Sequence, residues 1–190
     1  MPRATRWLIV LLAAFTSSVF TTPAGASTAR CEAEILRAAA RHKVPVGVLY
    51  AVGLTETGRK GSLYAWALNI EGRAVYPRSA QDAVRTFESA RREGKKLIDL
   101  GCMQINYHYH SQQFSGVRQM LDPARNVDYA ARFLADLKKR HGSWAMAVAR
   151  YHAGPNNNPA QQRYICRVIK NLVATGFGKW TPEARKFCNS

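Results

Sequence analysis

The sequence predicts a mainly α-helical (α+β) domain with a small β element. Apolar residues at helical spacing, bounded by capping residues, recur from about residue 31 to about residue 175. Strand and hairpin patterns are confined to a stretch between about residues 67 and 100. No internal repeat or low-complexity linker divides the chain, so residues 27–190 are expected to form a single domain.

Residues 1–26 are predicted to be a secretory signal peptide. Two arginines precede a short apolar run at residues 7–14, and residues 24–26 form a small-x-small cleavage site. The apolar run is too short for a stable membrane span. We therefore expect a chain that begins at Ser27 after cleavage, is periplasmic or secreted and has no stable membrane span, with an uncleaved anchor as the alternative.

The chain is strongly basic, with 28 Lys and Arg residues against 12 Asp and Glu residues. Removing the leader with its two arginines leaves 26 basic against 12 acidic residues, a net charge of +14. Such a surplus favours an anionic partner. Nucleic acid is not expected, because an exported protein rarely meets it and no recognition motif is present. Cell-wall polymers carry carboxylates and phosphates and fit the compartment better.

The four cysteines, Cys31, Cys102, Cys166 and Cys188, predict two disulfides in an exported chain. Three pairings are possible. Terminal segments of compact domains often lie close together, which favours Cys31–Cys188 with Cys102–Cys166. The cysteine spacing does not match a zinc site, and no phosphate-binding loop or nucleophile elbow is present, so we expect no metal and no cofactor.

Two helices are expected at the start of the domain. The first covers residues 31–43 and is amphipathic. The residues expected to face inward are Ile35, Leu36 and Ala39. The second helix begins at Pro45 and ends at Gly58. It is apolar on nearly every side, which predicts that it is buried.

A β element and a charged helix follow. Residues 67–70 and 73–76 are expected to form a hairpin around a turn at Glu71-Gly72. A helix with a serine cap is expected from Ser79 to about Glu93. Residues 97–100 then form a further strand-like run.

Three helices are expected in the C-terminal part. Asp122-Pro123 begins a long helix that Gly142 ends, and a shorter helix covers residues 144–153. Asn158 begins the last helix, and a tail containing Trp180 follows it. The expected buried faces are Val127, Ala130, Phe133, Leu134 and Leu137 in the long helix, and Tyr164, Ile165, Val168, Ile169 and Leu172 in the last one.

Glu56, at the end of the buried helix, is the first candidate catalytic residue. Burial deprives a carboxyl group of water and raises its pKa. A carboxylic acid that keeps its proton near neutral pH can act as a general acid on an ether-like oxygen. The alternative is a helix C-terminus at which Glu56 is exposed to solvent.

Three other polar segments are candidates for binding. Gln104 and Asn106, two residues apart in a segment predicted to be extended, suit neutral sugars, or else they belong to a turn that satisfies its own backbone. Residues 107–110 hold two histidines without a third metal ligand nearby, which favours a solvated, glycan-facing loop. Tyr151 precedes a forced helix break and either lines a cleft or belongs to the core.

These segments together resemble the soluble, lysozyme-like lytic transglycosylases of the SLT-domain family. That family has a catalytic Glu followed by Ser, then Gly-Leu-Met-Gln, an Asn-Ile helix, and Ala-Tyr-Asn-Ala-Gly-Pro. The corresponding residues are Glu56-Thr57, Gly101-Cys102-Met103-Gln104, Asn126-Val127 and Arg150-Tyr151-His152-Ala153-Gly154-Pro155. Order and rough spacing agree over about residues 31–175.

The resemblance implies a lysozyme-like, goose-type fold and peptidoglycan glycan strands as substrate. It implies that Glu56 protonates the β-1,4 bond between N-acetylmuramic acid and N-acetylglucosamine and then helps the muramyl 6-hydroxyl close a 1,6-anhydro ring. The other positions that it assigns to the substrate are Thr57, Met103, Gln104, Asn106 and Tyr151. A monomer is expected. Analogy with a Gram-negative subgroup implies local opening of the wall for flagellar or secretion assemblies.

The chain departs from the family pattern at several positions. Thr57 replaces Ser, Cys102 replaces Leu, Phe133 stands where Tyr is common, and His152 replaces Asn. Residues 71–100 form an insertion between the catalytic helix and the Gly-Cys-Met-Gln motif. A hydrolytic lysozyme is disfavoured because no second catalytic acid is evident, Asp99 being the only other acid near the motifs. A non-catalytic wall-binding module is the remaining alternative.

Overall fold

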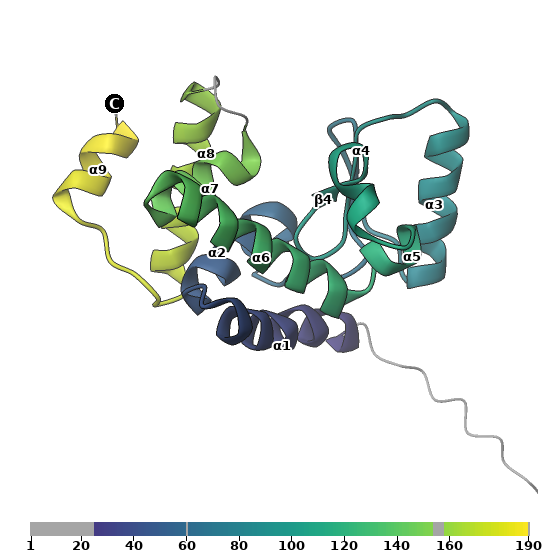
Figure 1. Ribbon diagram of the computed structural model, residues 1–190, viewed down its shortest axis with the longest axis horizontal. Coiled ribbons are helices and arrows are strands. Elements are labelled where there is room, and N and C mark those ends of the chain that lie inside the picture. The colour runs from purple at the N-terminus through teal and green to yellow at the C-terminus, as the bar shows by residue number, and fades with distance from the viewer. Residues whose placement is uncertain (1–24, 60, 154–157, 190) are drawn as a thin grey trace, which may run out of the picture.

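The computed structural model describes residues 25–59, 61–153 and 158–189. All but the last two residues of the predicted signal peptide lie outside this range. Within the described residues, no helix is both long enough and apolar enough to cross a bilayer. Figure 1 shows two lobes: helices form the lobe that carries the C-terminus, and the other lobe holds the strand region together with further helices. The predicted mainly helical class with a small β element is confirmed.

The first helix, α1 (Gly25–His42), packs against the long helix α6 (Pro123–His141) and against α2. Ile35 and Ala39 are buried, as predicted, but Leu36 is 62% exposed, so its inward placement was wrong. Ile35, Ala38 and Ala39 form an i, i+3, i+4 stripe that faces the core. Leu36 lies one residue, and therefore about 100° of helical rotation, away from Ile35.

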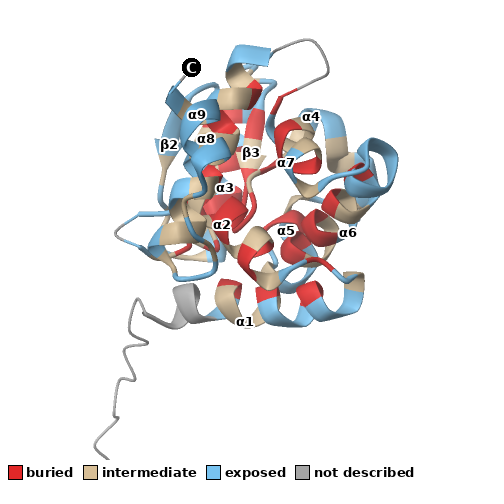
Figure 2. Ribbon diagram, turned by 90° about the vertical axis from the view of Figure 1, so that its left-hand side faces the viewer, coloured by how far each residue is buried: buried red, intermediate tan, exposed pale blue. Residues whose placement is uncertain are grey.

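The second helix, α2 (Val46–Thr57), has the predicted bounds, with Pro45 before it and Gly58 after it. Leu49, Ala51 and Val52 are fully buried. Figure 2 shows the buried residues concentrated on α2, β3 (Ile98–Leu100) and the inner face of α6, with α1 and the C-terminal helix α9 (Pro182–Asn189) exposed on their outer sides. The helix that carries Glu56 in its last turn is therefore held at the centre of the molecule.

The sheet has four antiparallel strands in the order β2-β1-β3-β4. The strands are β1 (Leu68–Ile70), β2 (Arg73–Val75), β3 (Ile98–Leu100) and β4 (Ile105–Asn106). The predicted hairpin and the predicted strand at residues 97–100 are confirmed to within a residue at each end. Alternation in β1 and β3 buries the apolar residues and leaves Asn69 and Asp99 paired with each other on the opposite face.

The insertion contains α3 (Ala80–Arg92), whose N-cap Ser79 accepts a hydrogen bond from the Asp82 amide, as its sequence predicted. After β4 come α4 (Tyr107–His110), a 3₁₀ turn (Ser111–Gln113) and α5 (Val117–Met120). The loop predicted at residues 107–110 is therefore a short helix.

The C-terminal helices begin and end close to the predicted residues. Asp122 caps α6, which Gly142 ends at φ +81°, and α7 (Trp144–His152) follows the Ser143 cap. The next helix is α8 (Asn158–Ala174), but it is not the last, because α9 (Pro182–Asn189) follows. The apolar positions of α9 include Phe187, which is 42% exposed, so the segment lacks the strong buried stripe on which the prediction of helices relied.

The disulfides join Cys31 to Cys102 and Cys166 to Cys188. The predicted pairing, Cys31–Cys188 with Cys102–Cys166, was wrong. The two ends of the described chain do not meet: α1 packs under α6, whereas α9 lies against α8 (Figure 1). Cys31 is instead brought to the turn after β3, and α9 is joined to the helix nearest to it.

Candidate active site

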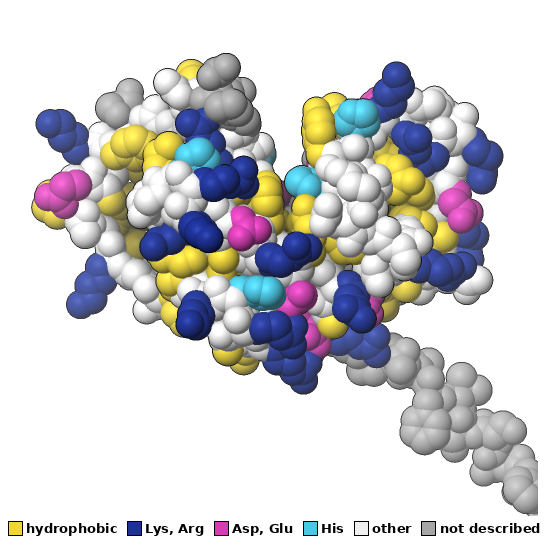
Figure 3. Space-filling model, viewed as in Figure 1, with side chains coloured by type: hydrophobic (Ala, Val, Ile, Leu, Met, Phe, Trp, Pro, Cys, Tyr) yellow, Lys and Arg dark blue, Asp and Glu magenta, His cyan; other side chains and the backbone are white. Residues whose placement is uncertain are grey.

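A cleft of about 400 Å³ separates the helical lobe from the sheet, and Figure 3 shows the hollow between the two lobes. Four of the six predicted site residues, Glu56, Gln104, Asn106 and Tyr151, line it. The other lining residues are Asn69, Glu71, Gly72, Leu97, Asp99, Ile105, Tyr109, His110, Phe133 and His152. Glu71, Gly72, Leu97 and Asp99 belong to the insertion, which therefore builds much of the sheet side of the cleft.

Glu56 lies in the last turn of α2, and its side chain is only 14% exposed. Burial raises the pKa of this carboxyl to about 7, and the nearby charge of Asp99 acts in the same direction. A hydrogen bond from Tyr164 and the charge of Arg167 oppose the rise in pKa. At neutral pH the group therefore holds its proton part of the time, as a general acid requires.

Tyr164 is a site residue that the sequence reading assigned only to the core. It is 1% exposed, and its hydroxyl donates a 2.5 Å hydrogen bond to Glu56 Oε1. The hydroxyl therefore orients the acid and stabilises its ionised form. No local pattern identifies this role, because Glu56 is 108 residues away in the chain.

The ring of His152 packs against the ring face of Tyr164. The two rings stack with centroids 4.2 Å apart and an interplanar angle of 3°, and His152 Nδ1 lies 4.0 Å from Glu56 Oε1. Burial lowers the pKa of His152, and the charge of Arg167 lowers it further. The imidazole is therefore mainly neutral at neutral pH, so it does not draw Glu56 into a permanent ion pair.

The Gly-Cys-Met-Gln motif forms a tight turn, not the extended segment that was expected. Gly101 has φ +79°, and a Cβ there would lie 2.6 Å from Asn126 Nδ2. Gln104 has φ +47°, and its Nε2 donates to the Ala67 and Gly101 carbonyl oxygens, each at 3.1 Å. The structure therefore gives Gln104 the alternative role of satisfying the backbone of its own turn, while the residue also lines the cleft.

Buried Asn126, on α6, fixes the turn at residues 101–104 through three side-chain hydrogen bonds. Its Nδ2 donates to the Leu100 and Met120 carbonyl oxygens, each at 2.8 Å, and its Oδ1 accepts from the Met103 amide at 2.8 Å. The side chain is fully buried, and all three bonds are to backbone groups. The asparagine of the motif therefore positions the cleft wall without touching the cleft.

The same turn, which contains Met103, is hydrogen-bonded to α2 through Thr57 and to α7 through Tyr151. The Thr57 hydroxyl donates to the Cys102 carbonyl oxygen at 3.0 Å, and the Tyr151 hydroxyl donates to the Met103 carbonyl oxygen at 2.7 Å. Thr57 is 2% exposed and Met103 is fully buried, and neither lines the cleft. Their positions therefore do not match the predicted substrate contacts, because both lie behind the cleft wall. Tyr151 presents its ring to the cleft.

A polar row crosses the sheet on the cleft side. Cross-strand pairing places Asn69 beside Asp99, and Asp99 beside Asn106. Asn106 Nδ2 donates to Asp99 Oδ1 at 2.6 Å, while its Oδ1 accepts from the His108 amide at 3.0 Å. Burial raises the pKa of Asp99, and the bond from Asn106 opposes that rise. A second carboxyl group, which the sequence reading did not place in the site, therefore shares the cleft with Glu56.

Asn69 adds an unused hydrogen-bonding group to this row. Its Oδ1 is buried and has no hydrogen-bond partner among the described residues. An unpartnered buried polar atom next to a cleft marks a position at which a ligand hydroxyl or amide can be bound. The strand pattern of residues 67–70 predicted its secondary structure but not this role.

One of the two histidines of α4, His110, lines the cleft. His110 Nδ1 and the Tyr129 hydroxyl lie 2.7 Å apart, and the His110 ring packs 5.2 Å from that of Phe133. Among the residues that the structure describes, no three His, Cys, Asp or Glu side chains come together as metal ligands would.

Replacing Tyr164 with Phe is expected to move the alkaline limb of kcat/KM to higher pH. The tyrosine hydroxyl lowers the pKa of Glu56, so its loss raises the pKa further above about 7. A reaction that needs protonated Glu56 is lost as pH rises through that pKa. Tyr50→Phe, on the same helix as Glu56, is the matched control. An unchanged or acid-shifted limb in Tyr164→Phe would contradict the assignment.

Comparison with known families agrees with this arrangement. The profile described as Transglycosylase SLT domain matches residues 35–171, which is most of the chain. Searches among curated proteins and among solved structures gave no match. The matched segment runs from α1 to α8 and includes Glu56, the turn at residues 101–104 and Tyr151. The chain belongs to the transglycosylase SLT domain family, and hence to the lytic-transglycosylase-type proteins that act on peptidoglycan.

Proposed function

We propose that this protein is an exported lytic transglycosylase. It cleaves the β-1,4 bond between N-acetylmuramic acid and N-acetylglucosamine and leaves a 1,6-anhydro-muramyl end. The observation that carries the proposal is Glu56, a carboxyl group with a pKa raised to about 7 that lines a cleft of about 400 Å³. A glycosidic oxygen needs a proton as its bond breaks, and an acid with this pKa supplies it near neutral pH.

In the proposed reaction Glu56 first donates a proton and later accepts one, so it ends in its starting protonation state. Glu56 donates a proton to the leaving oxygen of N-acetylglucosamine while the bond to the muramyl C1 breaks. The Glu56 carboxylate then takes the proton of the muramyl 6-hydroxyl, whose oxygen bonds to C1. The hydrogen bond from Tyr164 stabilises the carboxylate between the two steps. The route needs no water and no second catalytic acid.

Two sequence features support action outside the cytoplasm. Residues 1–26 have the pattern of a cleavable leader, and the chain carries two disulfides, which persist in oxidising compartments. We propose a periplasmic or secreted monomer whose partner is the glycan strand. Local opening of the wall for a flagellar or secretion assembly is proposed on family analogy alone.

Hydrolysis, as in a muramidase, is the second candidate, and Asp99 favours it. The sequence disfavours hydrolysis because it shows no evident second catalytic acid. In the structure Asp99 lines the same cleft as Glu56, and Asn106 orients its carboxyl group. A second carboxylate across the scissile bond can direct a water molecule to C1.

Product analysis separates the two reactions. Sacculi digested with the wild type and with Asp99→Asn are expected to release 1,6-anhydro products in both cases, as detected by mass spectrometry. Asp136→Asn, an exposed acid on α6, is the matched control. Hydrolysis would instead be established if the wild type released only products with reducing ends. These products should then be lost in Asp99→Asn and kept in Asp136→Asn. Binding to sacculi without any turnover would support a non-catalytic wall-binding module.

A further inference from the structure

The C-terminal segment lies outside the family match and is joined to the domain by its own disulfide. The match ends at residue 171, three residues before α8 ends, so α9 lies outside the matched segment. Cys166 of α8 is bonded to Cys188 of α9, and the two helices are in contact. Figure 1 shows α9 beside α8 at the end of the molecule opposite α3.

A groove of about 590 Å³ lies between α8 and the C-terminal segment. Arg163, Arg167 and Lys170 line it from α8, and Trp180 lines it from the segment before α9. The three cations are at i, i+4 and i+7, so they share one face of the helix, and all three are exposed. Residues 158–190 contain six Lys or Arg residues and one acid, Glu183.

The cations of the groove are not held in ion pairs by the described residues. No described carboxylate forms an ion pair with Arg163, Arg167 or Lys170. The Arg167 guanidinium instead lies 5.5 Å from the ring centroid of Tyr164. A row of unpaired cations beside an indole provides charge for an anion and an apolar face for its carrier.

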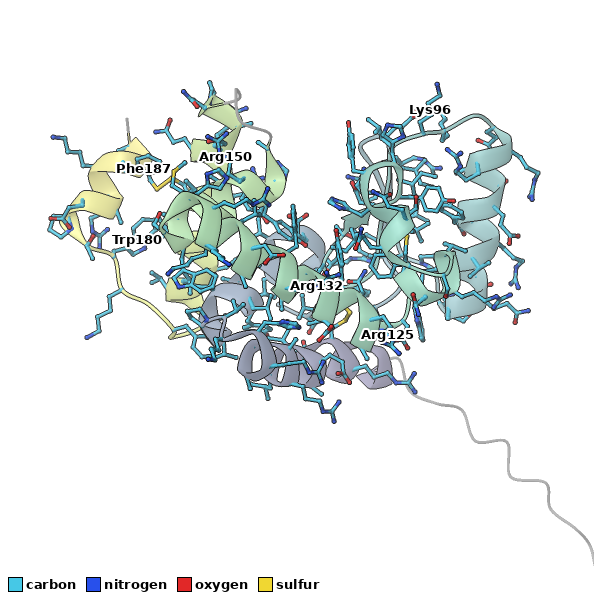
Figure 4. The ribbon with its side chains drawn as sticks, viewed as in Figure 1. Lys96, Arg125, Arg132, Arg150, Trp180 and Phe187 are labelled. Carbon is cyan, nitrogen blue, oxygen red and sulfur yellow. A yellow bond between two sulfur atoms is a disulfide. The ribbon has the colours of Figure 1, made fainter. Side chains whose placement is uncertain are left out.

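A buried cation occurs at the same end of the molecule. The Nε and Nη1 atoms of Arg150, on α7, are buried and have no hydrogen-bond partner among the described residues. Figure 4 shows Arg150 at the same end as Trp180 and Phe187, far from Lys96. This end of the protein therefore combines exposed cations with a partly buried one, and no described carboxylate forms an ion pair with Arg150, Arg163, Arg167 or Lys170.

We propose that the groove between α8 and α9 is a second peptidoglycan site, which binds the carboxylates of the peptide stems. The proposal rests on the proposed function in one respect, namely that the polymer in the cleft is peptidoglycan. The stems branch from the same strand whose sugars enter the cleft. Carboxylates of these stems are the anions closest to a strand bound at Glu56.

Helix α8 links the two sites. Tyr164 reaches from this helix to Glu56, while its neighbour Arg163 and the next-turn Arg167 line the groove. A strand bound in the cleft thus has its stems held at a high effective concentration near the groove. Two weak contacts on one polymer then give tighter binding than either contact alone.

Pelleting with insoluble sacculi tests the proposal without turnover, in a Glu56→Gln background. Arg163→Gln with Lys170→Gln removes two charges of the groove and leaves Arg167 over Tyr164. We expect this double variant to bind intact sacculi about fivefold more weakly, since each exposed ionic contact contributes modestly. Sacculi stripped of stems by an amidase should bind the parent and the double variant equally.

The matched control is Arg78→Gln with Arg92→Gln, two exposed cations at the other end of the molecule, one just before α3 and one at its last residue. It is expected to bind intact sacculi like the parent. Equal losses of binding in both double variants would mean that net charge alone accounts for the weaker binding, and this result would overturn the proposed site. A loss in the groove variant that persists on stripped sacculi would overturn the assignment to peptide stems, and unchanged binding to intact sacculi would overturn the groove itself.

Discussion

Glu56→Gln is expected to lower the rate of glycan cleavage by about a thousandfold or more, within the range that general acid catalysis contributes. Glutamine keeps the shape of the side chain and can still bond to Tyr164, but it has no proton to give to the leaving oxygen and cannot take one from the muramyl hydroxyl. The release of soluble muropeptides from sacculi measures the loss. The control is Glu88→Gln, an exposed acid on α3, which should retain the parental rate.

The same variant should keep or increase its stability, which separates lost chemistry from lost folding. The pKa of Glu56 rises from its ordinary 4.5 to about 7 in the folded protein. The folded state therefore holds the proton more tightly than the unfolded chain does, and the wild type loses stability as pH rises from 4.5 through about 7. The Gln variant cannot ionise there and should melt at the same or a higher temperature at pH 8. A lower melting temperature, or parental cleavage, would contradict the role of Glu56.

Removing the Cys31–Cys102 disulfide is expected to cost about 4 kcal/mol of unfolding free energy. The bond closes a loop with a sequence separation of 71 residues, and both cysteines are fully buried. It also joins α1 to the turn whose carbonyl oxygen accepts the Thr57 hydroxyl. The double Cys→Ala variant and the parent are compared by denaturant titration under oxidising conditions.

The second disulfide is the matched control. Cys166–Cys188 spans 22 residues and joins only α9 to α8, so its removal should cost less, about 3 kcal/mol or below. It should also leave the activity on isolated glycan strands close to that of the parent. A larger loss for this pair than for Cys31–Cys102 would mean that α9, and not the turn after β3, is the part of the fold that cross-linking stabilises.

Local patterns predicted the helices well because caps and breaks act within a few residues. Ser79, Asp122 and Gly142 each do in the structure what their positions indicated. A helical face is harder to assign, because a shift of one residue turns a side chain by about 100°, which explains the exposed Leu36.

The parts of the site that the sequence did not reveal depend on distant contacts. The prediction that Glu56 is a general acid rested on its own apolar helix, and the structure places this residue in the wall of a cleft. Tyr164 and the Asp99–Asn106 pair depend on helix packing and strand register, which single-sequence patterns do not specify. The cysteine pairing failed for the same reason, since connectivity depends on which segments meet in space.

The buried amide of Asn126 has a consequence for engineering the cleft. One side chain donates to the carbonyl oxygens of Leu100 and Met120 and accepts from the amide of Met103. Aspartate has a similar shape, but it would set a carboxylate against two carbonyl oxygens, and leucine would leave all three groups unbonded. No isostere among the common amino acids reproduces the set. A mutant library designed to broaden substrate range should therefore vary the rim, at Leu97 or Tyr109, and keep codon 126 constant.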